Sequence, residues 1–319
     1  MESYSVCQLR KEMRFEGFLL VRSAEKRKDV KGNDYVDMNL TDRTGEINCK
    51  IWNWESGAEA PAAGSVVKVR GTVQEYNGRL QLRVEKWREA AAEDPVDMSQ
   101  LVPCAPRKPE DMMQEIRETV ASFTSENLRK LTEGMLENAG EDLSWFPAAQ
   151  RMHHAERSGL LHHTSDMLRL AKAMLEVYPW LNRDLLLAGV IIHDLGKMDE
   201  LKSDQTGNVS DYTRDGQLLG HLVRGITNLN RVADRLGIHG ETVALLEHML
   251  LSHHGESEYG SPKAPMFPEA EALHLIDIMD ARMNTMKGVE DKTPEGAFSE
   301  KIFSLDRRIY HPRYTDDAE

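Results

Sequence analysis

The residues with the clearest chemical potential in this chain are an adjacent histidine and aspartate, His193 and Asp194, which directly follow the apolar segment LLLAGVII. An unpaired polar group in a protein core costs roughly 1–3 kcal/mol, so other groups must satisfy these two side chains. Taken alone, the pair is equally compatible with a metal site and with a hydrogen-bonded histidine at a capped helix end.

Further metal-capable side chains recur at intervals along the same half of the chain. Each lies in an apolar stretch and is therefore expected to face the interior of a helical bundle. Bundles build dinuclear metal sites from imidazoles and carboxylates on separate helices. The candidates beside the first pair are His163 in GLLHHT, His221 in LLGHL, His253 and His254 in SHHG, and Asp277 in LHLIDIMDA.

Seven stretches with apolar residues three and four apart would position these side chains. They cover residues 111–139, 159–178, 183–195, 218–236, 240–252, 268–287 and 295–304. Gly196, Gly237 and Gly255 stand where helices should end. Because no strand-like segment interrupts these stretches, we predict that this part of the chain is an all-α domain.

The N-terminal part contains five strand-like segments with alternating or β-branched residues, at 14–23, 34–42, 45–52, 65–76 and 79–87. Asn77-Gly78 predicts a type I′ hairpin turn, since both residues tolerate positive φ. Five short strands with the long connection after the third match a small OB barrel. The predicted fold is therefore multidomain α+β, with a five-stranded OB barrel followed by an all-α helical bundle.

The charge of the chain is divided unevenly between these two parts. The net charge is −13 over 319 residues, but residues 1–92 carry +2 and the remainder −15. Four prolines lie in the stretch 93–110, which predicts an extended linker. The expected order is an OB domain at 1–92, the linker at 93–110, a helical connector at 111–150, the domain with the metal candidates at 151–290, and a C-terminal helix and tail at 291–319.

Composition excludes several classes of protein. No apolar run approaches the roughly 18 residues of a membrane span, and no apolar segment follows the charged N-terminus as in a signal peptide. The three cysteines form no CxxC pair, which argues against a disulfide framework or a thiolate zinc site. We expect a cytoplasmic protein with no membrane partner. The sequence leaves open whether the chain forms a homo-oligomer.

The ordered strings GLLHHT, HDLGK, YTRDGQLLGH, LLSHHGESEYGSP, EALHLIDIMDA and SLDRRIYHPRY, behind a predicted OB barrel, resemble the YhaM-type 3′-5′ exoribonucleases. These are HD-domain metal-dependent phosphohydrolases. The resemblance covers nearly the whole chain. It implies that the helical part is an HD domain and that the substrate is single-stranded RNA, with single-stranded DNA as a second candidate.

The resemblance also implies roles for the candidate ligands. His163, His193, Asp194 and Asp277 would hold one divalent ion. Asp194, His221, His253 and His254 would hold the second ion, so that Asp194 bridges the two. Lys197 would neutralise phosphate charge, although an exposed lysine at a helix end is the competing interpretation. Nitrogen and oxygen ligands without thiolate suit Mn²⁺, Fe²⁺ or Mg²⁺ better than a structural Zn²⁺, and of these we expect Mn²⁺.

Three of these assignments leave a neighbouring residue as an alternative. His162 competes with His163, and Asp280 competes with Asp277. His253 and His254 are adjacent, and adjacent helical residues point about 100° apart, so one of them could lie outside the ligand set.

The predicted barrel offers an aromatic and basic surface for a nucleic-acid strand. Tyr35, Trp52 and Tyr76 are the expected stacking platforms, with Lys50 and Arg79 as phosphate partners. The competing interpretation is that such aromatic residues fill the core of a small barrel. Two other functions remain open: a phosphohydrolase of a free nucleotide or cyclic dinucleotide with a regulatory barrel, and a non-catalytic single-strand binder.

Overall fold

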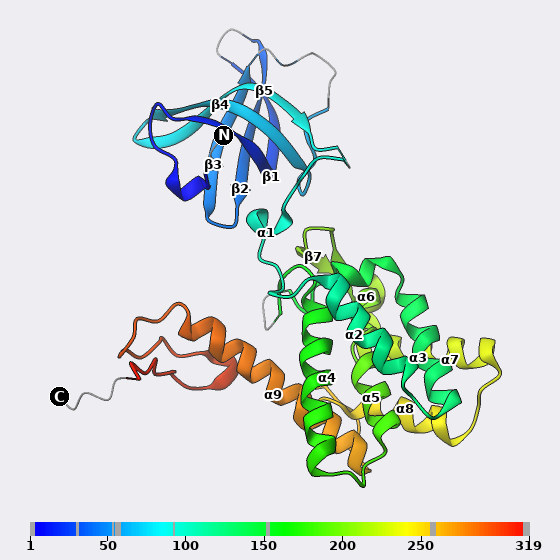
Figure 1. Ribbon diagram of the computed structural model, residues 1–319. Coiled ribbons are helices and arrows are strands. Elements are labelled where there is room, and N and C mark those ends of the chain that lie inside the picture. Colours follow the sequence, from blue (N-terminus) through cyan, green and yellow to red (C-terminus); the bar gives the residue numbers. More distant parts are fainter. Residues whose placement is uncertain are drawn as a thin grey trace. The chain divides into compact units, whose positions relative to one another are not determined.

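The computed structural model describes residues 4–29, 32–52, 54, 59–91, 93–150, 154–255 and 260–314. It contains two compact units, Met1–Cys104 and Ala105–Glu319 (Figure 1), and each is described by itself. Among the helices of the described ranges, none combines the length and the apolar composition needed to cross a membrane.

The first unit is a closed five-stranded barrel. Its strands are β1 (Arg14–Lys28), β2 (Asp34–Asp42), β3 (Gly45–Trp52), β4 (Val66–Tyr76) and β5 (Arg79–Glu89). The order around the barrel is β1-β2-β3-β5-β4, and β1 also pairs with β4. Strands β3 and β5 run parallel, whereas the other neighbours are antiparallel. This topology confirms the predicted OB barrel.

Alternation along the strands builds the barrel core. Met38 and Leu40 of β2 are fully buried in one cluster with Val69 of β4, while Asn39 between them lies nearer the surface. Asn77 and Gly78 join β4 to β5 with φ of 51° and 74°. Both angles are positive, as a type I′ turn requires, so the predicted hairpin is confirmed.

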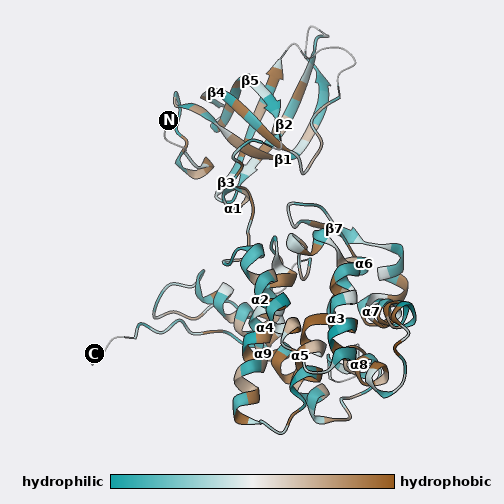
Figure 2. Ribbon diagram, turned by 45° about the vertical axis from the view of Figure 1, so that its right-hand side comes forward, coloured by the Kyte–Doolittle hydropathy of each residue, from teal (hydrophilic) through white to brown (hydrophobic). Residues whose placement is uncertain are grey.

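The second unit is helical, which confirms the predicted class of this part. Its helices are α2 (Pro109–Ala121), α3 (Glu126–Ala139), α4 (Gly159–Val177), α5 (Arg183–Ile192), α6 (Lys197–Glu200), α7 (Arg214–Leu236), α8 (Glu241–Ser252) and α9 (Pro268–Glu290). Helix α5 is apolar almost all round (Figure 2) and packs against α3, α4, α8 and α9. A helix with this composition is expected at the centre of a bundle.

The single helix predicted over 111–139 is wrong, because α2 and α3 are separate. Asp184, at the start of α5, fixes the break: its Oδ2 accepts hydrogen bonds from the backbone N–H groups of Thr124 and Ser125 and from the Thr124 hydroxyl. Ser125 then caps α3. The apolar spacing continues across the break, so periodicity alone does not reveal it.

The helix predicted over 295–304 is also wrong. Among the described residues, the helical structure in this segment is limited to the start of the 3-10 turn Phe303–Leu305. Gly296 has a φ of 75°, which ends any helix there, and Phe298 forms an isolated antiparallel bridge with Tyr310. The apolar residues of this segment therefore follow a bridged loop rather than a helical face.

A short hairpin contradicts the prediction that no strand interrupts the helices. It consists of β6 (Leu201–Ser203) and β7 (Val209–Tyr212) and connects α6 to α7. Just after it, Thr213 caps α7 and donates its backbone N–H to the carbonyl of Glu200. The hairpin thus ties the start of α7 to the end of α6.

The stretch 93–110, predicted as an extended linker, is not extended throughout. It contains the short helix α1 (Met98–Leu101), which Asp97 caps by accepting a hydrogen bond from the Ser99 backbone N–H. Helix α2 begins inside the same stretch at Pro109, a favourable first residue for a helix because its missing N–H has no intrahelical partner there.

Candidate metal centre

Seven predicted ligands converge on one buried region of the helical unit, although they come from five separate parts of the chain. The end of α5 supplies the central pair, because the helix terminates at Ile192 and the next two residues turn inward. The set consists of His163 on α4, His193 and Asp194 after α5, His221 on α7, His253 and His254 after α8, and Asp277 on α9.

Asp194 lies at the centre of this cluster. Its Oδ2 is 3.3 Å from His193 Nε2 and 3.7 Å from His163 Nε2. Its Oδ1 is 3.6 Å from His253 Nε2 and 3.7 Å from His221 Nε2. The two oxygens of one carboxylate therefore face two different pairs of imidazole nitrogens.

Two further side chains complete the two halves of the cluster. Asp277 Oδ1 lies 3.3 Å from His163 Nε2, on the side of the Asp194 Oδ2 atom. His254 Nε2 lies 3.3 Å from His221 Nε2, on the side of the Oδ1 atom. Each half thus contains three side chains in addition to the shared carboxylate.

Helix-end carbonyl groups orient two of the histidines. His193 Nδ1–H donates to the carbonyl of Val190 at 2.9 Å, and His253 Nδ1–H donates to the carbonyl of Leu250 at 2.9 Å. Both carbonyls lie three residues back and can only accept. In its neutral form, which is the form that binds a metal, each ring therefore carries its proton on Nδ1 and turns the Nε2 lone pair toward Asp194.

Carboxylates orient two more histidines in the same way. His221 Nδ1 lies 2.8 Å from Glu200 Oε2, and His163 Nδ1 lies 2.7 Å from Asp280 Oδ2. Asp280 thus lies behind His163, while Asp277 faces the cluster. The sequence does not single out Glu200, because it ends a four-residue helix that has no apolar periodicity.

The hydrogen bonding of the cluster is that of a metal site. Among the described residues, His193 Nε2, His253 Nε2 and Asp194 Oδ1 are buried without a hydrogen-bond partner. Three such atoms in one place cost several kcal/mol unless another species binds them. Imidazole lone pairs and a carboxylate oxygen are ligands for divalent transition metals, so these residues fit metal ions.

Electrostatics within the cluster favours ionised carboxylates. Burial opposes the charge of Asp194, but Lys197 and His193 outweigh it and hold the pKa of Asp194 well below its usual range. Burial likewise opposes the charge of Asp277, and His163 more than compensates, so the pKa of Asp277 is also lowered. Both carboxylates are therefore available as anionic ligands at neutral pH.

Both members of the adjacent pair His253 and His254 face the cluster. Helix α8 ends at Ser252, and the two adjacent rings lie with their centroids 4.3 Å apart at an interplanar angle of 71°. Burial, followed by the charges of His253 and His221, lowers the pKa of His254 to about 3. His254 is therefore neutral at pH 7 and keeps a lone pair for a ligand bond.

His162, the alternative to His163, faces away from the cluster. Its Nδ1 lies 2.8 Å from Glu156 Oε1 and its Nε2 lies 3.3 Å from Asp166 Oδ2. Burial opposes protonation, but Asp166 and Glu156 raise the pKa of His162 to about 9. The structure places His163 with the other candidate ligands, and His162 outside the cluster between Glu156 and Asp166.

Lys197 lies inside the site and is not an exposed lysine at a helix end. Its side chain is 13% exposed, and its Nζ donates to Asp194 Oδ2 at 2.6 Å. Burial opposes the charge of Lys197, but Asp194 raises the pKa of Lys197 above its usual value. A fixed positive charge therefore stands beside the central carboxylate.

The barrel carries the second predicted site, on the face of β2 and β3. Tyr35 and Trp52 are cross-strand partners whose rings stack at 4.8 Å with an interplanar angle of 28°. Lys50 Nζ lies 5.4 Å from the Tyr35 ring, 5.8 Å from the Trp52 ring and 5.9 Å from the Tyr76 ring. The structure thus brings three predicted aromatic residues around one lysine.

Exposure separates these aromatic residues from the barrel core. Trp52 is 48% exposed and Tyr76 is 61% exposed, so the competing interpretation as core residues is wrong for both. Arg79 is the cross-strand partner of Tyr76, and the two help to line a hollow of about 910 Å³ with Asn48 and Gln81. The face of β2 and β3 and the loop between β4 and β5 are where OB folds bind oligonucleotides.

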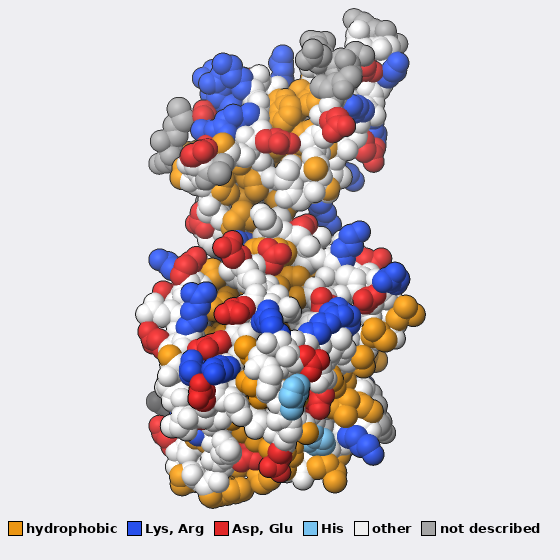
Figure 3. All heavy atoms as spheres, turned by 90° about the vertical axis from the view of Figure 1, so that its right-hand side faces the viewer, with side chains coloured by type: hydrophobic (Ala, Val, Ile, Leu, Met, Phe, Trp, Pro, Cys, Tyr) orange, Lys and Arg blue, Asp and Glu red, His pale blue; other side chains and the backbone are white. Residues whose placement is uncertain are grey.

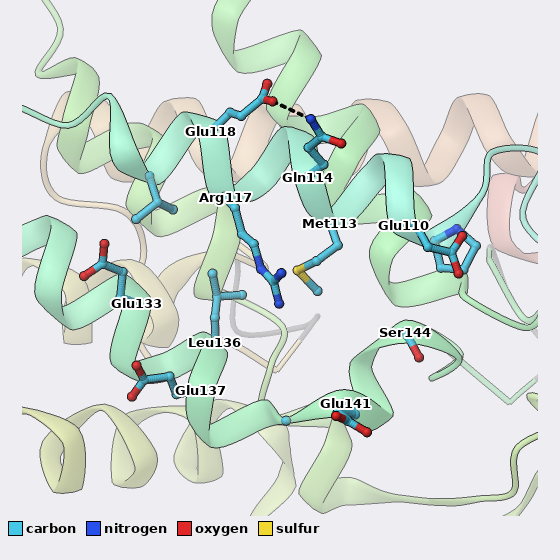
Figure 4. Close-up of a pocket in the computed structure, with 13 residues that line it drawn as sticks. Glu110, Met113, Gln114, Arg117, Glu118, Glu133, Leu136, Glu137, Glu141 and Ser144 are labelled. Carbon is cyan, nitrogen blue, oxygen red and sulfur yellow. Dashed lines mark hydrogen bonds between the residues drawn. The ribbon is translucent and has the colours of Figure 1, made fainter.

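A separate hollow of about 1070 Å³ lies between α2 and α3 (Figure 4). Its lining includes Arg117 and five glutamates, at positions 110, 118, 133, 137 and 141. None of the predicted site residues lines it. An acidic lining of this kind repels a phosphate backbone and does not favour nucleic acid.

Comparison with known protein families assigns a domain family to each of the two units. Residues 20–90 match the family described as OB-fold nucleic acid binding domain, and residues 160–282 match the HD domain family. The barrel, the helical unit and its histidine–aspartate cluster define the class: an HD-domain hydrolase that carries an OB-fold domain.

Full-length relatives identify the family more narrowly. The chain is 42% identical to 3′-5′ exoribonuclease YhaM of Listeria monocytogenes serovar 1/2a, over 93% of this chain and 95% of the relative. It is 41% identical to 3′-5′ exoribonuclease YhaM of a Geobacillus species, over 92% and 90%. The chain belongs to the YhaM family of 3′-5′ exoribonucleases.

Proposed function

We propose that this protein is a metal-dependent 3′→5′ exoribonuclease that removes nucleoside 5′-monophosphates from single-stranded RNA and also accepts single-stranded DNA. The family and the HD domain support the exoribonuclease activity. The two-ion mechanism, the products and the DNA activity are the finer part of the proposal. A cytoplasmic location, expected from the sequence, suits such a substrate.

The division of the Asp194 carboxylate carries the proposal of two ions. Its Oδ2 faces His193 and His163, and its Oδ1 faces His253 and His221. An ion on the Oδ2 side would also take Asp277, and an ion on the Oδ1 side would also take His254. These are the two ligand sets that the sequence resemblance implies, with Asp194 shared between them.

Two divalent ions, which we propose to be Mn²⁺, would supply Lewis-acid polarisation of the phosphodiester and a water nucleophile at neutral pH. Asp194 and the histidines would hold the ions and thereby fix the position of the scissile phosphate. Water forms a bond to phosphorus as the bond to the 3′-oxygen breaks, and the 3′-oxygen of the shortened strand takes up a proton. Lys197, with its ammonium beside Asp194, stabilises the charge that builds on the phosphate.

The barrel would hold the RNA strand through its bases and its backbone. Bases stack on Trp52, Tyr35 and Tyr76, and such stacking is sequence-tolerant because every base has a π-face. Lys50 and Arg79 meet the phosphates. Basic and acidic side chains are interspersed over the face of the molecule that Figure 3 shows, and residues 1–92 carry a net charge of only +2, so we expect stacking to contribute more than a broad basic field.

A 5′-labelled single-stranded RNA incubated with Mn²⁺-loaded protein tests this proposal. We expect a ladder that shortens from the 3′ end, with labelled fragments losing one nucleotide at a time. Asp194→Asn should abolish the ladder while the circular dichroism spectrum stays that of a folded protein. Endonucleolytic fragments alone, or hydrolysis confined to a free nucleotide or cyclic dinucleotide, would contradict it.

A further inference from the structure

A buried carboxylate lies directly behind one of the candidate ligands. Asp280 Oδ2 is 2.7 Å from His163 Nδ1 and 2.8 Å from His154 Nε2, so one oxygen serves two imidazoles. Asp280 is 6% exposed and His154 is 3% exposed. Because an ionised carboxylate only accepts hydrogen bonds, both rings must donate to it. The proton of His163 is thereby placed on Nδ1.

The loop before α4 is shaped to bring His154 to this carboxylate. His154 has a φ of 52°, in the left-handed region that few residues other than glycine adopt. Its backbone N–H donates to Asn284 Oδ1 of α9 at 3.1 Å, and its carbonyl accepts from Ala148 N–H at 3.2 Å. A side chain at Gly159 would overlap that carbonyl. The loop therefore holds a strained residue in place from three directions.

The other nitrogen of His154 continues the network outward. Since Nε2 donates to Asp280, Nδ1 is an acceptor, and His162 Nδ1 lies 3.0 Å from it. His162 shares this N–H with Glu156 Oε1 at 2.8 Å and directs its other nitrogen to Asp166. Each N–H group in this network therefore has at least one acceptor. The hydrogen bonds alone account for the arrangement of His154, His162 and Glu156, without a bound ion.

We propose that Asp280 and His154 are positioning residues of the metal centre, which hold His163 with its Nε2 lone pair directed at the ion shared with Asp277 and Asp194. This inference rests on the metal centre proposed above. A carboxylate behind a ligating imidazole fixes the ring and raises its basicity, and its removal typically costs 10–100-fold in metal affinity. The strained loop around His154 is then part of the metal site.

Titration of full-length apo-protein with Mn²⁺ by calorimetry tests the role of Asp280. Asp280→Asn should bind Mn²⁺ about 10–100-fold more weakly than wild type. The matched control is Asp184→Asn. Asp184 is as buried as Asp280, but it lies at the start of α5, whereas the metal cluster lies at the end of that helix. That control should lower thermal stability and leave the affinity unchanged. Equal affinity in wild type and Asp280→Asn, or equal losses in both variants, would overturn the inference.

Two variants at position 154 separate positioning from packing. His154→Leu removes the donor to Asp280, whereas His154→Gln retains an N–H, and neither substitution relieves the positive φ at this position. We expect His154→Leu to lose about 10-fold in Mn²⁺ affinity and His154→Gln to recover most of it. Equal effects of the two substitutions would show that His154 only fills space.

A spectroscopic signature reports the His163 proton directly. In Co²⁺-loaded protein, Nδ1–H protons of ligating imidazoles give paramagnetically shifted, exchangeable proton signals. One such signal should move or broaden by solvent exchange in Asp280→Asn and persist in Asp184→Asn. An unchanged set of signals in Asp280→Asn would contradict the placement of this proton.

Metal counting distinguishes this inference from its rivals. If His154, Glu156 and His162 themselves held an ion, Glu156→Gln would lower the number of bound ions by one without weakening the rest, and the positioning role would be wrong. If wild type binds no Mn²⁺, the proposed metal centre fails. If wild type binds and Asp280→Asn binds equally, only the positioning role fails.

Discussion

His253 Nε2 lies 3.6 Å from Asp194 Oδ1, and neither atom has a hydrogen-bond partner among the described residues. The separation is too long for a hydrogen bond, yet both atoms are buried. The two atoms do not bond to each other, but a metal ion between them would bind both.

Metal binding should stabilise the helical unit. An ion that binds only the folded state adds about 2.7 kcal/mol to the free energy of unfolding at 100 times its Kd. We therefore expect Mn²⁺ to raise the melting temperature of chelator-treated protein in differential scanning fluorimetry. Asp194→Asn should abolish most of the increase. An equal increase in wild type and Asp194→Asn would place the ions elsewhere.

Removal of Lys197 should slow the chemical step more than it weakens substrate binding. Loss of a donor to the developing charge typically costs about 100-fold in kcat, so Lys197→Gln should reduce kcat by this order while KM changes little. Lys202, an exposed lysine on β6, provides the control variant Lys202→Gln. Steady-state kinetics on a short RNA measures both constants. A selective rise in KM would instead assign Lys197 to substrate binding.

The exposed tryptophan of β3 should contribute strongly to RNA binding. Base–aromatic stacking is worth about 1–3 kcal/mol per base, so Trp52→Ala should weaken binding of a single-stranded RNA by about 5–150-fold. Trp180, which is 68% exposed on the helical unit, is the matched control. Fluorescence anisotropy with a labelled oligonucleotide measures both variants. Comparable losses of RNA affinity in the Trp52 and Trp180 variants would contradict base stacking on the barrel.

Gly196 should be indispensable to the metal centre because it lets two segments approach closely. A Cβ at this position would overlap the carbonyl of His221 and lie 2.8 Å from the backbone nitrogen of Gly225. Gly196→Ala should therefore displace α7 and lower both Mn²⁺ affinity and thermal stability. Gly288→Ala, on α9, meets nothing within 4 Å and is the control. Normal metal affinity in Gly196→Ala would contradict the tight packing.

Local pattern was sufficient to predict the barrel and the ligand-bearing helices. Alternation along β2 buries Met38 and Leu40, and the apolar run before His193 makes α5 a central helix. These features depend on residues close in sequence. The break between α2 and α3 depends instead on Asp184, about 60 positions further along, and so no local period could show it.

The choice between neighbouring residues required the packing of helices. Asp277 and Asp280 lie three positions apart on α9 and share one side of the helix. The packing of α9 against α4 decides that Asp277 faces the cluster and that Asp280 lies behind His163. His154 meets Asp280 across 126 positions, through a loop whose left-handed residue has no signature in the sequence.

The location of bound ions tests the central claim most directly. Crystals of the full chain grown with Mn²⁺ and measured near the manganese absorption edge would show each ion as an anomalous peak. We expect two peaks, one in contact with Asp194 Oδ2, His163, His193 and Asp277, and the other with Asp194 Oδ1, His221, His253 and His254. A single peak, or peaks that do not touch Asp194, would contradict the proposal that this carboxylate bridges two ions.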